Sequence, residues 1–240
     1  MDQGAELVFQ EDNPVREARL ILQLPAGWEY KGSWASASPV QPTPASEGGL
    51  QWTVRDVPEI KVEPRMPAFF SLSGQMEISY FGPNQKVISV ESWEALGRWY
   101  VGLTSDRRNP TPEISQKARD LTAGKADFDN KARTLASFLQ TDVRYVEIKI
   151  GIGGYQPHPA GDIFRARYGD CKDKVTLLSS MLQEVGIRSD YVLINTHRGI
   201  VNPASHSALF DHAILAIELP ANLNEEAHHS VLRSKNGNDI

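Results

Sequence analysis

The chain has 240 residues, of which 40% are hydrophobic, so it is long enough to bury the cores of two modest domains. Its 25 Lys and Arg residues against 30 Asp and Glu residues give a net charge of -5. No segment gathers basic residues into a patch, which argues against nucleic acid as a partner. No apolar run approaches the roughly 20 residues needed to cross a bilayer, and the N-terminus lacks the pattern of a secretory signal. Composition therefore indicates a globular protein and leaves its compartment open.

The first hundred residues show the pattern of short strands. Apolar and polar side chains alternate in several short runs, and Pro and Gly punctuate the gaps. These runs are residues 6–9, 18–24, 50–54 and 75–80. Short strands separated by turns are typical of an antiparallel sandwich. We therefore expect an all-β, sandwich-like domain over residues 1–104 that is incomplete at its start.

A polar segment at residues 104–112 carries two prolines and predicts the domain boundary, because the apolar period changes after it. Helices and strands are expected beyond it in this order: helices 112–121 and 127–140, a strand 144–148, a loop 151–159, helices 162–167 and 171–185, and strands 191–195 and 213–219. Helices first and strands afterwards predict an α+β fold with an antiparallel sheet over residues 110–240.

Neither a nucleotide nor a metal is expected. The glycine-rich loop at residues 151–159 lacks the Lys-Ser or Lys-Thr ending of a phosphate loop, and no strand-to-helix unit frames it. The single cysteine excludes an intramolecular disulfide and a zinc site built from several thiolates. His228 and His229 resemble a metal pair only by residue type. We therefore expect no cofactor.

Cys171 stands where the strongest helix is expected to begin. The unpaired N–H groups and the positive dipole end of a helix start favour the thiolate, which is the nucleophilic form of a thiol. The same N–H groups are suited to stabilise an oxyanion on an attacked carbonyl. The alternative is a buried and inert cysteine, because free Cys is among the most buried residue types.

His212 is expected at the start of a strand, where its ring is easily presented to a cleft. A histidine beside a cysteine nucleophile acts as its base. The alternative is a surface histidine at a junction of loop and strand. Gln156 and His158 are candidates for lining the cleft or donating to an oxyanion, and a Pro-rich loop that merely packs is an equally good interpretation.

The charged residues around Cys171 have simpler interpretations. Asp170 is suited to cap the helix. Lys172, Asp173 and Lys174 are interpreted as solvated charges of its first turn, where the acidic side chain also suits the helix dipole.

Two segments together suggest a family. Residues 167–174, Arg-Tyr-Gly-Asp-Cys-Lys-Asp-Lys, resemble the nucleophile segment of bacterial transglutaminase-like proteins, and residues 210–214, Phe-Asp-His-Ala-Ile, resemble their histidine segment. Residues 143–145 and 154–158 are similar to the lead-in of the same family, so the resemblance covers roughly residues 110 to 220. The preceding β module, with Trp93 and residues 98–100, resembles the uncharacterised β-sandwich domain often found before this core in bacterial envelope proteins.

The resemblance implies a papain-like core with a Cys-His-Asp triad, in which Cys171 is the nucleophile and His212 its base. In the family the aspartate opens an Asp-Pro-Thr-like turn on the strand after the histidine strand. The sequence reaches Ile240 without such a turn, and Asp239 lies in a loop context. We therefore expect the core to be truncated before the third triad residue. The resemblance also implies a periplasmic or cell-envelope location.

The leading hypothesis is a cysteine-dependent acyl transfer on peptide or protein amides through a thioester. Release to water gives a protease or amidase, and release to an amine gives cross-linking. By analogy with the family, hydrolysis is the better expectation. The alternative hypothesis is a non-catalytic module that binds protein or glycan, or serves assembly, and keeps the fold.

Overall fold

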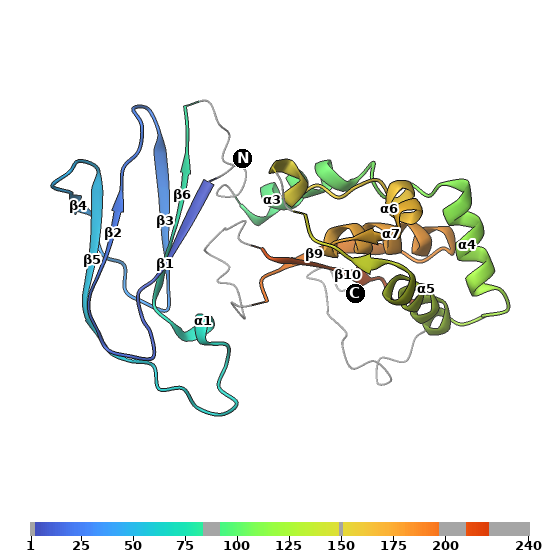
Figure 1. Cartoon of the computed structure of the whole chain (residues 1–240), viewed down its shortest axis with the longest axis horizontal. Coiled ribbons are helices and arrows are strands. Elements are labelled where there is room, and N and C mark those ends of the chain that lie inside the picture. Colours follow the sequence, from blue (N-terminus) through green and yellow to red (C-terminus); the bar gives the residue numbers. More distant parts are fainter. Residues whose placement is uncertain (1–2, 84–91, 149–150, 197–209, 221–240) are drawn as a thin grey trace. The chain divides into compact units, whose positions relative to one another are not determined.

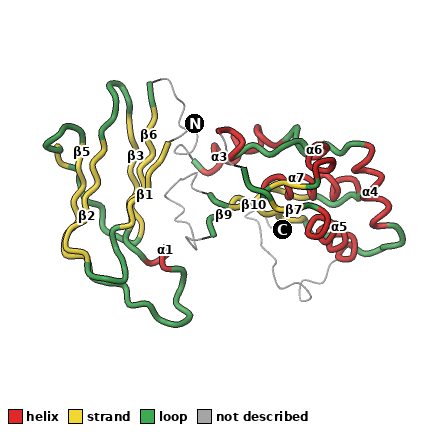
Figure 2. The backbone as a smooth tube through the Cα atoms, in the orientation of Figure 1, coloured by secondary structure: helices red, strands yellow, loops and turns green. Residues whose placement is uncertain are grey.

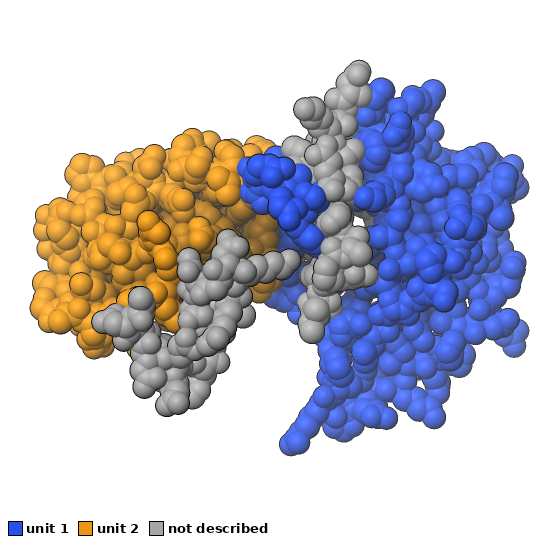
Figure 3. Space-filling view, turned by 180° about the vertical axis from the view of Figure 1, so that it is seen from behind, with its two compact units in different colours: residues 1–99, 195–210 blue, residues 100–194, 211–240 orange. Residues whose placement is uncertain are grey.

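The computed structural model describes residues 3–83, 92–148, 151–196 and 210–220 (Figure 1). The chain divides into two compact units, which Figure 3 shows in different colours. Unit 1 comprises Met1–Trp99 and Asn195–Phe210, and unit 2 comprises Tyr100–Ile194 and Asp211–Ile240. Within the described residues, no helix is long and apolar enough to cross a membrane.

Unit 1 contains two antiparallel sheets of three strands each (Figure 2). The first has the order β1-β6-β3, and the second has the order β2-β5-β4. Their bounds are β1 Gln3–Val8, β6 Gln75–Phe81, β3 Glu29–Ala35, β2 Val15–Leu22, β5 Leu50–Val57 and β4 Thr43–Pro44. A short helix, α1 (Phe69–Leu72), precedes β6. The expectation that the N-terminal region is rich in antiparallel sheet is confirmed.

Both sheets contribute to one hydrophobic cluster. Trp52 of β5 and the pair Met76 and Ile78 of β6 are buried in it. The Tyr30 ring of β3 meets the Trp52 ring edge-on, with centroids 5.5 Å apart, so aromatic packing joins the two sheets.

The expected strand pattern was wrong at the end of the first hundred residues, because α3 (Trp93–Thr104) is a helix. Leu96, Tyr100 and Thr104 are buried and lie four residues apart. That spacing places them on one helical face, a period that the polar and aromatic residues between them obscure.

Unit 2 begins with the end of α3 and is built mainly from helices. They are α4 (Pro112–Thr122), α5 (Phe128–Asp142), α6 (Ala160–Ala166) and α7 (Cys171–Glu184), with a 3₁₀ turn η1 (Gly151–Gly154). The antiparallel pair β9 (Ser189–Ile194) and β10 (His212–Ile217) follows α7. The predicted order of helices and then antiparallel strands is confirmed.

Local sequence explains where the helices of unit 2 start. The Thr111 hydroxyl accepts a hydrogen bond from the N–H of Ile114, and Pro112 occupies the first turn of α4. The Asp127 side chain likewise accepts from Asn130 N at 2.8 Å and caps α5.

The expected strand at residues 144–148 is much shorter. Only β7 (Arg144–Tyr145) forms, and it pairs in parallel with β8 (Tyr168–Gly169). This pairing matters for the site, because it brings Tyr145 opposite Gly169, two residues before Cys171.

Helix α7 is the centre of the unit 2 core. Its Leu177, Met181 and Leu182 are fully buried and pack in one cluster with Ile114 of α4 and Leu135 of α5. Leu215 and Ile217 of β10 pack against the same cluster from the sheet. An apolar face of this extent fixes the position of α7, and with it the position of Cys171 at its first residue.

Candidate active site

The start of α7 is fixed by a capping box. Asp170 Oδ1 accepts from the N–H of Asp173 at 3.3 Å, and Asp173 Oδ2 accepts from the N–H of Asp170 at 3.4 Å. The helix begins at Cys171, as predicted. Asp170 is therefore the cap that the sequence indicates.

The charges beside Cys171 are buried, which corrects the expectation that they are solvated. Lys172 forms an ion pair with Asp170, and the two side chains are only 6% and 3% exposed. Asp173 is buried as well, because its carboxylate serves both the cap and His158. Lys174 is only partly exposed. It donates to Val143 O at 2.8 Å, and burial lowers its pKa.

Cys171 is half-buried and lies close to Tyr145. Burial raises the pKa of Tyr145, and the charge of Cys171 together with a hydrogen bond to Cys171 raises it further. The β7 and β8 pairing explains this contact, since Arg144 N donates to Arg167 O at 2.9 Å and Val146 N donates to Gly169 O at 3.0 Å.

Tyr100 lies within electrostatic range of the same helix start. Burial is the main cause that raises its pKa, followed by Tyr191 and then Cys171. The rings of Tyr100 and Tyr191 meet edge-on at 5.7 Å, and the Tyr191 hydroxyl lies 2.9 Å from Thr176 Oγ1 on α7. Tyr100 and Tyr191 therefore pack together beside α7.

His212 begins β10 and pairs with Ile194 at the end of β9. Two contacts fix the direction of β9 along α7. Ser189 Oγ donates to Ser179 Oγ at 2.9 Å, and Tyr191 contacts Thr176 further toward the helix start. The sheet end that carries His212 is therefore at the same end of the unit as Cys171.

The described structure does not show Cys171 and His212 bonded to each other. By alternation along β10, His212 shares the strand face of Ile214, whereas Ala213 and Leu215 are on the face that packs against the core. In the described residues, no hydrogen bond links Cys171 to His212. Their roles as nucleophile and base remain a prediction.

The two loop candidates have separate environments. Gln156 Nε2 donates to Leu103 O at 3.3 Å, which ties the loop to the end of α3. His158 contacts Asp173, with its backbone N–H at 2.8 Å and its ring Nδ1 at 3.1 Å from the carboxylate. Their suggested roles in the cleft or toward an oxyanion remain predictions.

Three further residues considered from sequence, His228, His229 and Asp239, lie outside the described residues. Within the part of the chain that the structure describes, no cluster of three or more His, Cys, Asp or Glu side chains is placed to hold a metal ion.

Part of the chain is similar to known proteins. Residues 115–229 match the family model of the transglutaminase-like superfamily. A structure of a "putative protease" from Parabacteroides distasonis is 20% identical, with a TM-score of 0.63 over 90% of this chain and 41% of that protein. A structure of a "putative cysteine protease" from Cytophaga hutchinsonii is 10% identical, with a TM-score of 0.37 over 91% of this chain and 74% of the other. A search of curated proteins found no match.

Residues 115–229 are thus a transglutaminase-like region, by their match to that family model. The similarity to the Parabacteroides structure supports the fold alone, and this chain spans less than half of that protein's length.

Sequence interpretation missed Tyr145, Tyr100 and the burial of Asp173 at this site. The two tyrosines lie outside the nucleophile segment, and tertiary packing alone brings them to Cys171. The signal for Asp173 was the spacing of Asp170 and Asp173, which fits a capping box.

Proposed function

We propose that this protein is a cysteine-dependent acyl-transfer enzyme that hydrolyses peptide or protein amides through a thioester. The observation that carries the proposal is the position of Cys171 as the first residue of a capped helix within a transglutaminase-like region. Helix N-termini favour thiolate, so the backbone prepares this sulfur for nucleophilic attack.

The same helix start supplies candidate oxyanion donors. The N–H groups of Asp173 and Lys174 are satisfied by the side chain and the carbonyl of Asp170. Among the described residues, the N–H groups of Cys171 and Lys172 have no acceptor. Two free donors next to the sulfur are what a tetrahedral intermediate requires.

The buried ion pair adjusts the charge at this site. An isolated Asp170 carboxylate next to Cys171 would oppose thiolate formation by like-charge repulsion. Lys172 neutralises that carboxylate while leaving it free to cap the helix. The positive end of the helix then faces the sulfur without an unpaired carboxylate beside it, and the Tyr145 hydroxyl lies close to the sulfur.

In the proposed reaction, Cys171 Sγ attacks the carbonyl carbon of an amide. The C–N bond breaks, and the amine leaves with a proton that we assign to His212. Water then attacks the thioester, His212 accepts its proton, and the acid is released from Sγ. His212 is suited to this role by its position at the sheet end level with the helix start.

The proposal is tested with p-nitrophenyl acetate, an activated ester that acylates nucleophilic thiols. Wild type should release p-nitrophenolate in a burst and carry one acetyl group on Cys171 by mass spectrometry of tryptic peptides. Cys171→Ala should give neither result. Adding monodansylcadaverine then separates hydrolysis from transfer to an amine, and we expect release to water to dominate.

A wild type that shows no burst and no acetylated Cys171 would contradict acyl transfer. Equal burst amplitudes in wild type and Cys171→Ala would contradict the choice of nucleophile. Either result leaves the transglutaminase-like fold serving as a binding module.

A further inference from the structure

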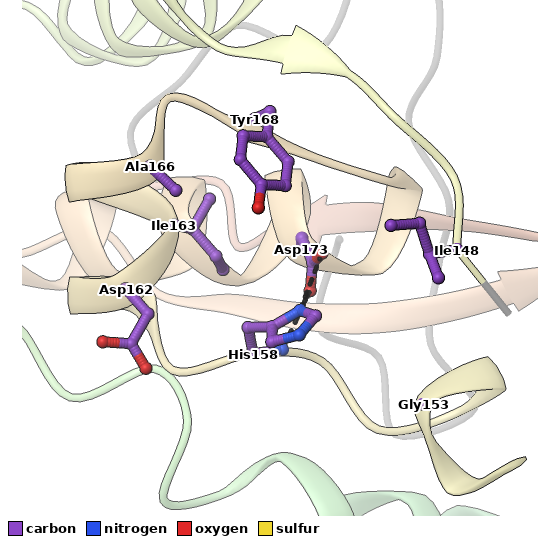
Figure 4. A pocket seen from close by; sticks show the side chains of 8 residues that line it. All are labelled: Ile148, Gly153, His158, Asp162, Ile163, Ala166, Tyr168 and Asp173. Carbon is purple, nitrogen blue, oxygen red and sulfur yellow. Dashed lines mark hydrogen bonds and ion pairs between the residues drawn. The ribbon is translucent and has the colours of Figure 1, made fainter. Parts of the chain in front are cut away.

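Beside the start of α7 lies a pocket of about 330 Å³, which the proposed reaction does not use (Figure 4). This volume is at the small end of the range of ligand pockets, roughly 300–1,000 Å³. Its lining combines aliphatic and aromatic side chains with three polar ones. The lining residues are Ile148, Gly153, His158, Asp162, Ile163, Ala166, Tyr168 and Asp173.

A buried carboxylate orients the histidine of the pocket. His158 Nδ1 lies 3.1 and 3.2 Å from the two oxygens of Asp173, as the dashed lines in Figure 4 show. An ionised carboxylate only accepts hydrogen bonds, so Nδ1 carries the proton. In the neutral ring Nε2 is then an acceptor, on the edge of the ring away from Asp173. The His158 side chain is 68% exposed, so Nε2 is accessible to a ligand.

The rest of the pocket is suited to an apolar group next to a hydrogen-bond donor. Ile163 and Ala166 come from α6, and Ile148 comes from the segment after β7. The other carboxylate of the pocket, Asp162, pairs with Arg165 at the surface. With Nε2 and Asp162 both accepting, the polar part of the pocket disfavours an anion.

The pocket shares the start of α7 with Cys171, which is not among its lining residues. Asp173 lies two residues after Cys171, and Ile148 lies three residues after Tyr145, which contacts the sulfur. Side chains two residues apart on an α-helix point in directions about 200° apart around its axis. Asp173 and Cys171 therefore face different sides of the helix start. A ligand in the pocket therefore lies against the first turn of α7 and leaves the sulfur free.

We propose that this pocket is a specificity subsite, which holds an aliphatic side chain of a peptide substrate while His158 Nε2 accepts a hydrogen bond from a peptide N–H. The inference rests on the proposed function for the identity of its ligand. His158 has a recognition role here, positioned by Asp173.

Binding is tested on the full chain carrying Cys171→Ala, with N-acetyl-leucine amide as the probe and N-acetyl-glycine amide as its matched control. NMR signals of the His158 ring and the Ala166 methyl group should shift saturably with the leucine compound. Its affinity should exceed that of the glycine compound by about tenfold, because only leucine places an aliphatic side chain in the pocket.

Variants then locate the site. Ala166→Leu fills the pocket from an exposed helical position and should abolish the preference for leucine. Ala123→Leu makes the same change at an exposed position outside the pocket and should retain the preference. His158→Ala should weaken binding of both compounds. Binding that is absent, or equal for the two compounds, or unchanged in Ala166→Leu, would overturn the proposal.

A second arm separates the subsite from the reaction. With Cys171 present, alkylation by N-chloroacetyl-leucine amide should be faster than by N-chloroacetyl-glycine amide, and Ala166→Leu should bring that ratio toward one. A ratio of one in wild type overturns the link to the nucleophile. Leucine-selective binding without acylation by p-nitrophenyl acetate would contradict the proposed enzymatic function. The pocket would then still be a recognition site.

Discussion

The Cβ atom that Gly169 lacks would lie 2.5 Å from the Cβ of Asp173 and 2.9 Å from its Oδ2. Real side chains do not approach so closely, so only glycine lets β8 run directly against the first turn of α7. The close approach lets Asp173 reach both the N–H of Asp170 and the ring of His158. The Gly-Asp-Cys-Lys-Asp sequence is thus a packing unit around Cys171.

Gly169→Ala should therefore lower the free energy of unfolding by about 1–3 kcal/mol, as overpacking does. Gly102→Ala is the control, because nothing lies within 4 Å of its added Cβ in α3. That change should be neutral or stabilise by about 0.5–1 kcal/mol. Urea denaturation measures both, and equal stabilities for the two variants would contradict the close approach.

A second prediction follows from the buried ion pair of Lys172 and Asp170. Lys172→Met leaves the Asp170 carboxylate buried without its cation, and loss of one partner of a buried pair costs about 3–5 kcal/mol. Arg188→Met removes one partner of the exposed pair with Glu218 and should cost at most about 1 kcal/mol. Unfolding free energies at neutral pH compare the two. Similar losses would show that Lys172 and Asp170 are not a buried pair.

The N-terminal cap of α5 is expected to make the stability of the fold depend on pH. Hydrogen bonds from Asn130 hold the pKa of Asp127 below its ordinary value. Since the folded pKa is the lower one, Asp127 stabilises the fold above pH 4 and loses this effect as the pH falls through the folded value. Asp127→Ala should lower the melting temperature at pH 7. The difference from wild type should shrink as the pH falls below about 4, and a constant difference would contradict this assignment.

Tyr145 offers a test of the surroundings of the sulfur. The pKa of Tyr145 is raised, so the hydroxyl keeps its proton at neutral pH and is available as a donor to Cys171. Tyr145→Phe should slow alkylation of Cys171 by iodoacetamide, by less than about tenfold since the tyrosine is half exposed. Tyr30→Phe, in unit 1, is the control. An unchanged rate in Tyr145→Phe would contradict the hydrogen bond.

Sequence periodicity predicted most elements of unit 2, because its helices carry caps and clear apolar faces. Asp170 and Asp127 signal their helix starts, and Gly186 follows the end of α7. Helix α3 was missed because polar and aromatic residues between its buried positions obscure the helical period.

The candidate site was only partly accessible from sequence. The position of Cys171 at the first residue of α7 was predictable, since a helix start follows from local signals. The contacts of Tyr100 and Tyr145 depend on tertiary packing over long stretches of chain, which no local pattern contains. The burial of Lys172 and Asp173 was mispredicted because charged residues in a first turn are usually solvated, and their partners here are supplied by Asp170 and a distant loop.

The pairing of Cys171 with His212 is tested most directly by the rate of iodoacetamide alkylation as a function of pH, in wild type and in His212→Ala. Cys171→Ala identifies the labelled residue. Wild type should react faster than free cysteine at pH 6–7, and His212→Ala should lose about tenfold or more of that rate while retaining part of the acceleration from the helix start. Identical profiles for wild type and His212→Ala would contradict the pairing, and a rate no faster than that of free cysteine would contradict the nucleophile.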